Sequence, residues 1–275
     1  MLSDLIKYIP AQKERIDSIS PGLDPNTMVC NYWREFRESI WGKDASKWQM
    51  VEDVDRGDDR VRDDRLPDGP PGSCTVATLP KSLPDAWSID SKKILVRTDY
   101  HEALNAALLA NDTNVTVFVV RGQPGIGELP FPPPPAQSDL CLGKSIFLLW
   151  LLMHRLAHRL PTALQIHHSY AILFHEDGVS QFLAPDDKLR YPGLRFEPED
   201  RSKRIWALVD TNQSLLEPAD IFKNSPSFFI VNSVSPRAKY TDWIGKLSYQ
   251  KFYVNPWSVM EILQGYVDPS AVSQR

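Results

Sequence analysis

Residues that could do chemistry together stand on both sides of a proline-rich segment. Gly122, Gly125 and Gly127 follow an apolar run rich in β-branched residues, and Lys144 and Ser145 open a second, strongly apolar run. Glycines in such a turn let successive backbone N–H groups point at one anion at the start of a helix. A Lys at this position reaches the β- and γ-phosphates of a nucleotide, and a Ser hydroxyl binds Mg²⁺. These five residues therefore predict a binding site for ATP or GTP and a magnesium ion.

The predicted phosphate loop is interrupted. Its spacing, GxxxxGK[ST], requires Lys and Ser directly after the third glycine. Residues 128–143 instead stand between Gly127 and Lys144. Without these 16 residues the chain would read VFVVRGQPGIGKSIFLLWLL, which is a strand, a complete phosphate loop and a buried helix.

Two explanations of the interruption stay open. Residues 128–143 are either a surface loop or a segment that splicing removes from the messenger RNA. Closing a loop of this length costs only about 2.5 kcal/mol plus a constant. The loop would, however, separate the glycine amides from Lys144 and weaken phosphate binding by orders of magnitude. The codons available at both ends of the segment can hold splice-donor-like and acceptor-like sequences, and its removal keeps the reading frame, which favours the second explanation.

A carboxylate ends a later apolar run. Residues 205–209 are all apolar, and Asp210 follows them. In phosphate-loop enzymes a carboxylate at the end of a neighbouring strand helps to hold the magnesium ion, so we expect Asp210 and Ser145 to share it. The alternative is a strand that ends in Asp without a function, which is common. Thr211 stands where many strong ATPases carry a catalytic Glu, so the sequence predicts no rapid hydrolysis.

Polar residues also end the next apolar run. Residues 228–231 are apolar and lead into Asn232 and Ser233, with Arg237 a few residues further on. Polar groups at the end of such a strand lie near the γ-phosphate, where an Arg stabilises the charge of the phosphoryl group during transfer. We therefore take Asn232 and Arg237 as catalytic candidates, with Ser233 beside them. The alternative is a loop with a solvated Arg.

The histidines point less clearly to a site. His154 and His158 are four residues apart, so one helix face would present both to a metal ion. No carboxylate or thiol accompanies them, and we interpret them as the polar end of a helix. The sequence shows no convincing Ser-His-Asp or Cys-His set and no carboxylate-Lys set of a nuclease.

The elements that must position these residues alternate along the chain. Continuous apolar strands that alternate with helices favour a parallel sheet covered on both faces. We therefore predict an α/β fold, a three-layer, mostly parallel sheet of the phosphate-loop NTPase type with a helical N-terminal extension. The expected strands are residues 93–97, 115–120, 163–166, 170–175, 179–183, 205–210, 228–232 and 252–255, and the expected helices are residues 32–41, 100–110, 144–160 and 256–265.

Composition divides the chain into three parts. Residues 1–50 are expected to form the helical extension. Residues 51–88 are rich in Asp, Arg, Pro and Gly and are expected to form a solvated linker or long loop. Residues 89–275 are expected to form the nucleotide-binding domain, with residues 128–143 as an insert within its phosphate loop.

Bulk properties exclude several classes of protein. A net charge of −4 argues against a broad nucleic-acid-binding surface. The 3 cysteines have no metal-ligand spacing, which is typical of a reduced, intracellular protein. The apolar run at residues 146–153 is too short to cross a bilayer, which needs about 20 apolar residues. Charged residues follow soon after Met1, so we expect no signal peptide and a cytoplasmic or nuclear location.

Several segments together resemble a known family. They are YWREFRESIW, VRTDYHEAL, VVRGQPGIG with GKSIFLLWLL, IWALVD, SPSFFIVNSVSPR and FYVNPWSVMEI, and they span roughly residues 30–265 with gaps. This pattern is similar to the phosphate-loop NTPase module of Crinkler and retrotransposon-hot-spot-type proteins, as found in mushroom-forming fungi. The phosphate loop and the later SPR and PWS segments are its most specific parts.

The resemblance implies a module that binds ATP or GTP and is related to AAA+ and signal-transducing ATPases. It also implies the nucleotide and magnesium roles of Lys144, Ser145 and Asp210. Family members often couple this module to a nuclease-like or other effector domain, so we expect a protein partner or an effector domain that this chain lacks. Two departures are the interrupted loop and the end of the chain soon after the last expected strand, from which we expect a C-terminal effector or lid domain to be absent. The secretion header of oomycete members is not visible either. The alternative function is an interaction module, or the product of a decayed gene, that keeps the fold and binds no nucleotide.

Overall fold

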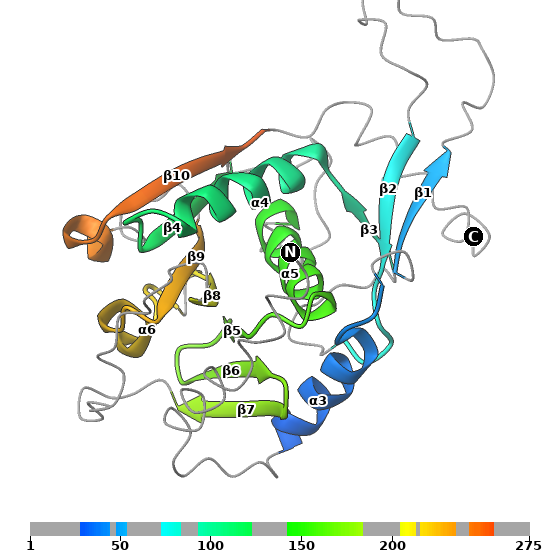
Figure 1. Ribbon diagram of the computed structural model, residues 1–275, viewed down its shortest axis with the longest axis horizontal. Coiled ribbons are helices and arrows are strands. Elements are labelled where there is room, and N and C mark those ends of the chain that lie inside the picture. The colour runs from blue at the N-terminus through cyan, green and yellow to red at the C-terminus, as the bar shows by residue number, and fades with distance from the viewer. Residues whose placement is uncertain are drawn as a thin grey trace, which may run out of the picture.

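The structure is a computed structural model, and it describes residues 28–44, 48–53, 73–83, 93–122, 142–183, 204–212, 215–234 and 242–255. The described elements form two sheets and the helices that cover them (Figure 1). In chain order they are α3 (Met28–Ile40), β1 (Gln49–Asp53), β2 (Ser73–Thr78), β3 (Lys93–Val96), α4 (Thr98–Asn111), β4 (Val117–Gly122), α5 (Leu142–Ala157), β5 (Thr162–Gln165), β6 (Tyr170–His175), β7 (Gly178–Leu183), β8 (Ile205–Asp210), α6 (Asp220–Asn224), β9 (Phe228–Val234), η5 (Asp242–Lys246) and β10 (Tyr249–Val254).

The larger sheet has seven strands in the order β10-β4-β9-β8-β5-β6-β7. The strands from β10 to β5 in this order pair in parallel, whereas β6 pairs antiparallel with both β5 and β7. The apolar runs of β4, β8 and β9 are the central strands, and they are buried almost throughout. Strands covered on both faces read as continuous apolar runs. The prediction of an α/β fold with a mostly parallel sheet is confirmed.

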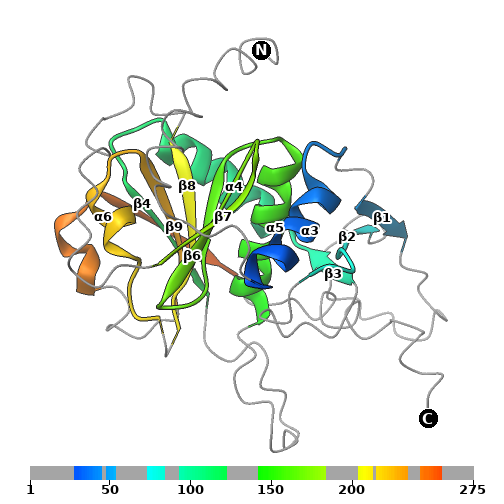
Figure 2. The ribbon, with the colours of Figure 1, turned by 90° about the horizontal axis from the view of Figure 1, so that it is seen from below.

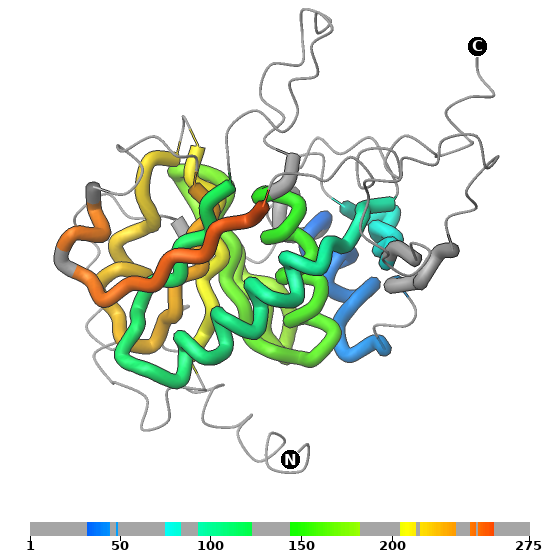
Figure 3. Tube along the Cα trace, turned by 90° about the horizontal axis from the view of Figure 1, so that it is seen from above, coloured from blue at the N-terminus to red at the C-terminus, as the bar shows by residue number. Residues whose placement is uncertain are grey.

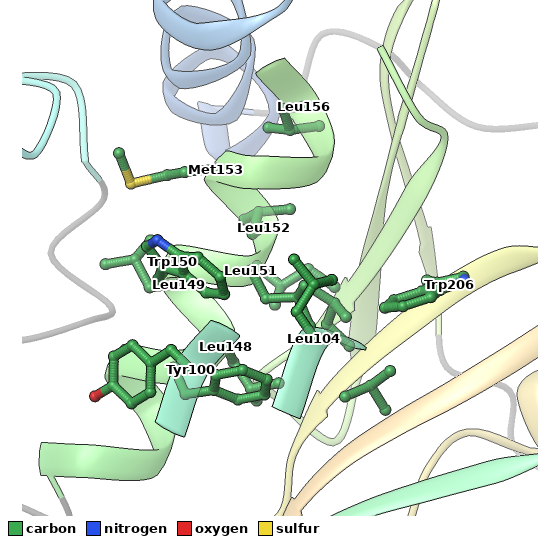
Figure 4. Close-up of a cluster of buried hydrophobic side chains, with 14 of the residues drawn as sticks. Tyr100, Leu104, Leu148, Leu149, Trp150, Leu151, Leu152, Met153, Leu156 and Trp206 are labelled. Carbon is green, nitrogen blue, oxygen red and sulfur yellow. The ribbon is translucent and has the colours of Figure 1, made fainter. Parts of the chain in front are cut away.

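One face of the larger sheet, here called the α5 face, carries α4, α5 and α3 (Figure 2). The side chains of α5 from Phe147 to Met153 are fully buried because the helix lies between the sheet and its other helical neighbours. Figure 4 shows the leucines of α5 between Tyr100 of α4 and Trp206 of β8. The guanidinium of Arg155 lies 4.2 Å from the ring centre of Trp206 and donates to Thr162 Oγ1. The buried apolar side chains of α5 and the contacts of Arg155 together hold the helix against the sheet.

The opposite face, here called the α6 face, carries α6 and η5. Phe222 of α6 packs edge-on against Phe228 of β9, with ring centres 4.9 Å apart. The connection from β4 to β5 crosses the α5 face, whereas the connections from β8 to β9 and from β9 to β10 carry the α6-face helices. A right-handed crossover requires connections that move in opposite directions along the sheet to lie on opposite faces. The sheet therefore has a helical layer on each side.

The helix expected within residues 1–50 is part of the main core. Trp33 of α3 packs edge-on against Phe174 of β6, with ring centres 5.7 Å apart. The buried Arg37 donates to the carbonyl oxygens of His175 (2.9 Å) and Glu176 (2.5 Å) in the turn between β6 and β7. α3 is thereby fixed to the antiparallel end of the larger sheet.

The segment expected to be a linker contains strands. β1 and β2 lie wholly or largely within residues 51–88, and with β3 they form an antiparallel sheet. Ala77 and Ile94 of this small sheet are buried against the same core as α4. β1 and β2 were missed because they are only 5 and 6 residues long and flank a charged stretch. The strand expected at residues 93–97 is real but belongs to this sheet, and the helix expected at residues 256–265 lies outside the described residues.

Candidate functional site

The carboxyl ends of β4, β9 and β8 lie side by side along one edge of the larger sheet. The connection that leaves β4 crosses the α5 face, and the connection that leaves β9 crosses the α6 face. In open α/β sheets, ligands bind outside the carboxyl ends of the strands at the point where adjacent connections leave in opposite directions. The first turn of α5 begins beside this point, so its free backbone N–H groups and the positive end of its dipole lie there.

Lys144 lies in the first turn of α5 and packs against Gly122, the last residue of β4. A Cβ atom on Gly122 would lie 3.2 Å from Lys144 Cγ and 3.3 Å from Cδ, so only a glycine permits this approach without displacing the lysine. Lys144 is 7% exposed, and its ammonium makes no hydrogen bond or close ion pair with any residue that the structure describes. A buried ammonium without a counter-ion is costly, and an anion at the start of α5 would remove that cost.

Ser145 joins the start of α5 to the end of β8. Its hydroxyl donates a hydrogen bond of 2.7 Å to Asp210 Oδ2, across 65 residues of chain. Burial raises the pKa of the Asp210 carboxyl above its ordinary value, while hydrogen bonds from Ser145 and Ser233 and the charge of Lys144 act in the opposite direction. The four groups therefore share one electrostatic environment. The hydroxyl oxygen of Ser145 and the carboxylate of Asp210 are ligands of the kind that Mg²⁺ prefers.

The pairing register selects Ser233 of β9 rather than Asn232. Side chains of a strand alternate between the two faces of a sheet. Ser233 pairs with Asp210 in the register of β8 and β9. It comes two residues after Val231, whose side chain lies in the core of the α5 face, so its own side chain points to that face as well. Its buried hydroxyl lacks a hydrogen bond of good geometry in the described part of the chain, although it lies close enough to Asp210 to lower the pKa of the carboxyl.

The side chain of Asn232 does not lie where the sequence predicted it, beside the phosphates. It is level with Val119 and Val209, which belong to the core of the α6 face, so alternation points its amide away from Lys144. The side chain is completely buried, and neither of its polar atoms has a partner among the described residues. The sequence run did not reveal this because the face of each strand residue depends on the register.

The other predicted site residues fall outside the described residues. They are Gly125, Gly127 and Arg237. The structure thus brings Gly122, Lys144, Ser145 and Asp210 together, and it leaves the middle of the phosphate loop and the arginine as predictions. It also brings Arg97, Asp99 and Asn255 to the same edge, a group with no sequence signal because Asp99 and Asn255 are 156 residues apart.

His154 of α5 and His158, which follows the end of the helix, have their rings in contact. The rings of His154 and His158 have centres 4.4 Å apart, and a ring nitrogen of His158 lies 2.8 Å from the carbonyl oxygen of His154. Burial, with the nearby charges of His158, Arg155 and His101, lowers the pKa of His154 to about 4, so it is neutral at pH 7. Within the described ranges, no group of three or more His, Cys, Asp or Glu side chains has the arrangement of a metal site.

Comparison with known proteins adds no family. No protein-family model matches the chain, and no curated protein or solved structure matches it. In the described part of the chain, none of the helices combines the length and apolar character needed to cross a membrane. The resemblance set out above therefore stays a proposal, carried by the motifs and by the geometry of this edge.

The raised pKa of Asp210 predicts a pH-dependent stability. Because the pKa is higher in the folded chain than in the unfolded chain, the fold binds a proton more tightly and loses stability as the pH rises through the folded value. Without ligand, Asp210→Asn is expected to be more stable than the parent at neutral pH and to gain nothing at acid pH. Urea unfolding between about pH 4 and pH 8 measures this. Asp112→Asn, at an exposed carboxylate, is the control, and identical pH profiles for parent and Asp210→Asn would contradict the prediction.

Proposed function

We propose that the chain binds a nucleoside triphosphate, ATP in the first place, together with Mg²⁺, at the carboxyl edge between β4 and β8. The observation that carries the proposal is the 2.7 Å hydrogen bond between Ser145 and Asp210, which joins the two elements that a phosphate-loop NTPase uses for its metal. Lys144, buried beside Gly122 at the same edge, supplies the cation for the β- and γ-phosphates.

The arrangement of strands supports this reading. β9 lies between β4, which leads into the phosphate loop, and β8, which ends in Asp210. Its last residues therefore lie between the lysine and the carboxylate, where they would face the γ-phosphate. The residues present fit the ion: Ser145 and Asp210 would hold Mg²⁺, which would neutralise charge on the phosphates. In this proposal the chain is a relative of the Crinkler and retrotransposon-hot-spot-type NTPase module.

Hydrolysis is proposed to be slow, so that the bound nucleotide acts as a switch. Thr211 follows Asp210, and its hydroxyl donates to the carbonyl oxygen of Ser233 (2.8 Å) instead of offering a base to an attacking water molecule. Ser233 orients groups at this position but is too weak a base to activate water. A partner or an effector domain would read the state of the nucleotide.

Titration with MgATP tests the proposal. We expect MgATP to raise the midpoint of thermal unfolding in a concentration-dependent way, because a ligand that binds only the folded state stabilises it. Removal of Mg²⁺ with EDTA is expected to abolish most of this shift, and GTP in place of ATP reports base preference. No shift with either nucleotide, in the full chain and in a chain without residues 128–143, would refute nucleotide binding and leave an interaction module as the function.

A further inference from the structure

Two buried residues, Arg97 and Asp99, and the exposed Asn255 form a polar group at the end of β10, here called the Asp99 cluster. Asp99 Oδ2 accepts a hydrogen bond of 2.8 Å from the backbone N–H of Asn255, and Asp99 Oδ1 accepts one of 3.3 Å from its side-chain amide. Arg97 donates to the carbonyl oxygen of Asn255 (3.0 Å) and pairs with Asp99 Oδ2 (3.4 Å). Arg97 and Asp99 are 4% and 9% exposed, so the pair is shielded from solvent.

The Asp99 cluster joins three elements. Arg97 directly follows β3 of the small sheet, Asp99 lies in the first turn of α4, and Asn255 directly follows β10. An Asp in the first turn of a helix commonly serves its own helix through the dipole or a cap. Here both carboxylate oxygens accept hydrogen bonds from Asn255, which is distant in sequence. The cluster therefore serves tertiary structure.

The cluster lies next to the candidate site. Val254, the residue before Asn255, is level with Gly122 in the parallel pairing of β10 with β4. Among the strands that the structure describes, β10 lies at the edge of the sheet and pairs with β4 alone. Its carboxyl end is thus held on one side by β4 and on the other by Asp99. Because a Cβ on Gly122 would already crowd Lys144, a small shift of this end of β4 alters the position of the lysine.

We infer that Asp99 is a positioning residue for the phosphate site: it fixes the end of β10 against Gly122, and so holds Gly122 and Lys144 in the geometry that grips the phosphates. This inference rests on the proposed function. The same contacts connect this end of β10 to β3 through Arg97. Asp99 itself touches neither phosphate nor metal in this account.

α4 offers a matched control at its other end. Arg204, which directly precedes β8, donates to the carbonyl oxygens of Val115 (2.7 Å), Thr113 (3.4 Å) and Asn111, and so ties the connection between α4 and β4 to the start of β8. Arg204 acts at the end of α4 and near the amino ends of β4 and β8, whereas Asp99 acts at the start of α4 and at the carboxyl end of β10. Figure 3 shows α4 and β10 side by side. If Asp99 had only a structural role, substitutions of Asp99 and of Arg204 would affect the candidate site equally.

Hydrogen exchange of the full chain tests the positioning without any nucleotide. Asp99→Ala is expected to speed amide exchange by at least about tenfold in peptides covering residues 117–122 and 249–255, because the end of β10 loses its second anchor. Arg204→Met is expected to speed exchange near residues 111–116 and to leave Gly122 unchanged. Equal exchange at Gly122 and Val254 in the parent and in Asp99→Ala would overturn the inference.

Nucleotide titration tests the consequence for the site. Asp99→Ala is expected to weaken MgATP binding about tenfold, whereas Arg204→Met leaves the dissociation constant within about twofold while lowering thermal stability. The exchange of partners in Asp99→Asn with Asn255→Asp keeps one carboxylate in the cluster and is expected to restore most of the affinity. Unchanged affinity in Asp99→Ala, when the parent binds, would also overturn the inference. If neither the parent nor the chain without residues 128–143 binds nucleotide, the proposed function fails, and the exchange measurement still decides whether Asp99 positions Gly122.

Discussion

Replacing Lys144 with Met is expected to weaken MgATP binding at least about a hundredfold. The ammonium would make charge-assisted hydrogen bonds to the phosphates, each worth about 1.5–3 kcal/mol, and two of them correspond to two or more powers of ten in affinity. Isothermal titration of parent and variant measures the loss. Lys43→Met, at an exposed lysine after α3, is the matched control and should bind as the parent does.

The same substitution is expected to stabilise the protein when no nucleotide is present. Lys144 is 7% exposed, and no carboxylate in the described part of the chain lies within ion-pair distance of its ammonium, so the more distant charge of Asp210 offsets its cost of desolvation only in part. Met has a similar length and no charge, and we expect the free energy of unfolding to rise by about 1 kcal/mol in urea titrations. Lost binding together with raised stability distinguishes a ligand-binding lysine from a structural one. A variant that binds MgATP as tightly as the parent would contradict the site.

Removing residues 128–143 is expected to tighten MgATP binding at least about a hundredfold. The deletion joins Gly127 directly to Lys144 and restores the GxxxxGK[ST] spacing, so the glycine amides and the ammonium act on the same phosphates. Binding energy then need not be spent on closing a long loop around the ligand. Titration of the full and the shortened chain with MgATP measures the difference.

A linker control separates sequence from length in this experiment. A chain in which a Gly/Ser linker of equal length replaces residues 128–143 is expected to bind as weakly as the full chain, because the spacing stays wrong. Sequencing of mature transcripts across the junction then distinguishes a surface loop from a spliced segment. Equal affinity of the full and the shortened chain would show that the interruption does not impair the site.

Local sequence patterns predicted much of the fold. The runs that end in Val120, Asp210 and Asn232 are strands because buried parallel strands need apolar residues at every position, and that need is visible in the sequence alone. The α5 segment could also be predicted as a buried helix, because its apolar run is longer than a typical strand and basic residues follow it. Gly122, Lys144 and Ser145 could be selected because a phosphate-binding turn demands particular residue types, and their spacing becomes that of the motif once residues 128–143 are left out.

Pairing between distant segments decided the rest. Nothing local says that β9 lies between β4 and β8, that Ser233 and not Asn232 shares a face with Asp210, or that two short strands of a charged segment join β3. A shift of one residue in register would exchange the two faces of a strand, and the energy that selects the register comes from the whole core. Likewise, Asp99 meets Asn255 only because α4 and β10 pack side by side. The chain itself specified which residues suit phosphate and magnesium, and the packing of distant strands determined which of them lie together.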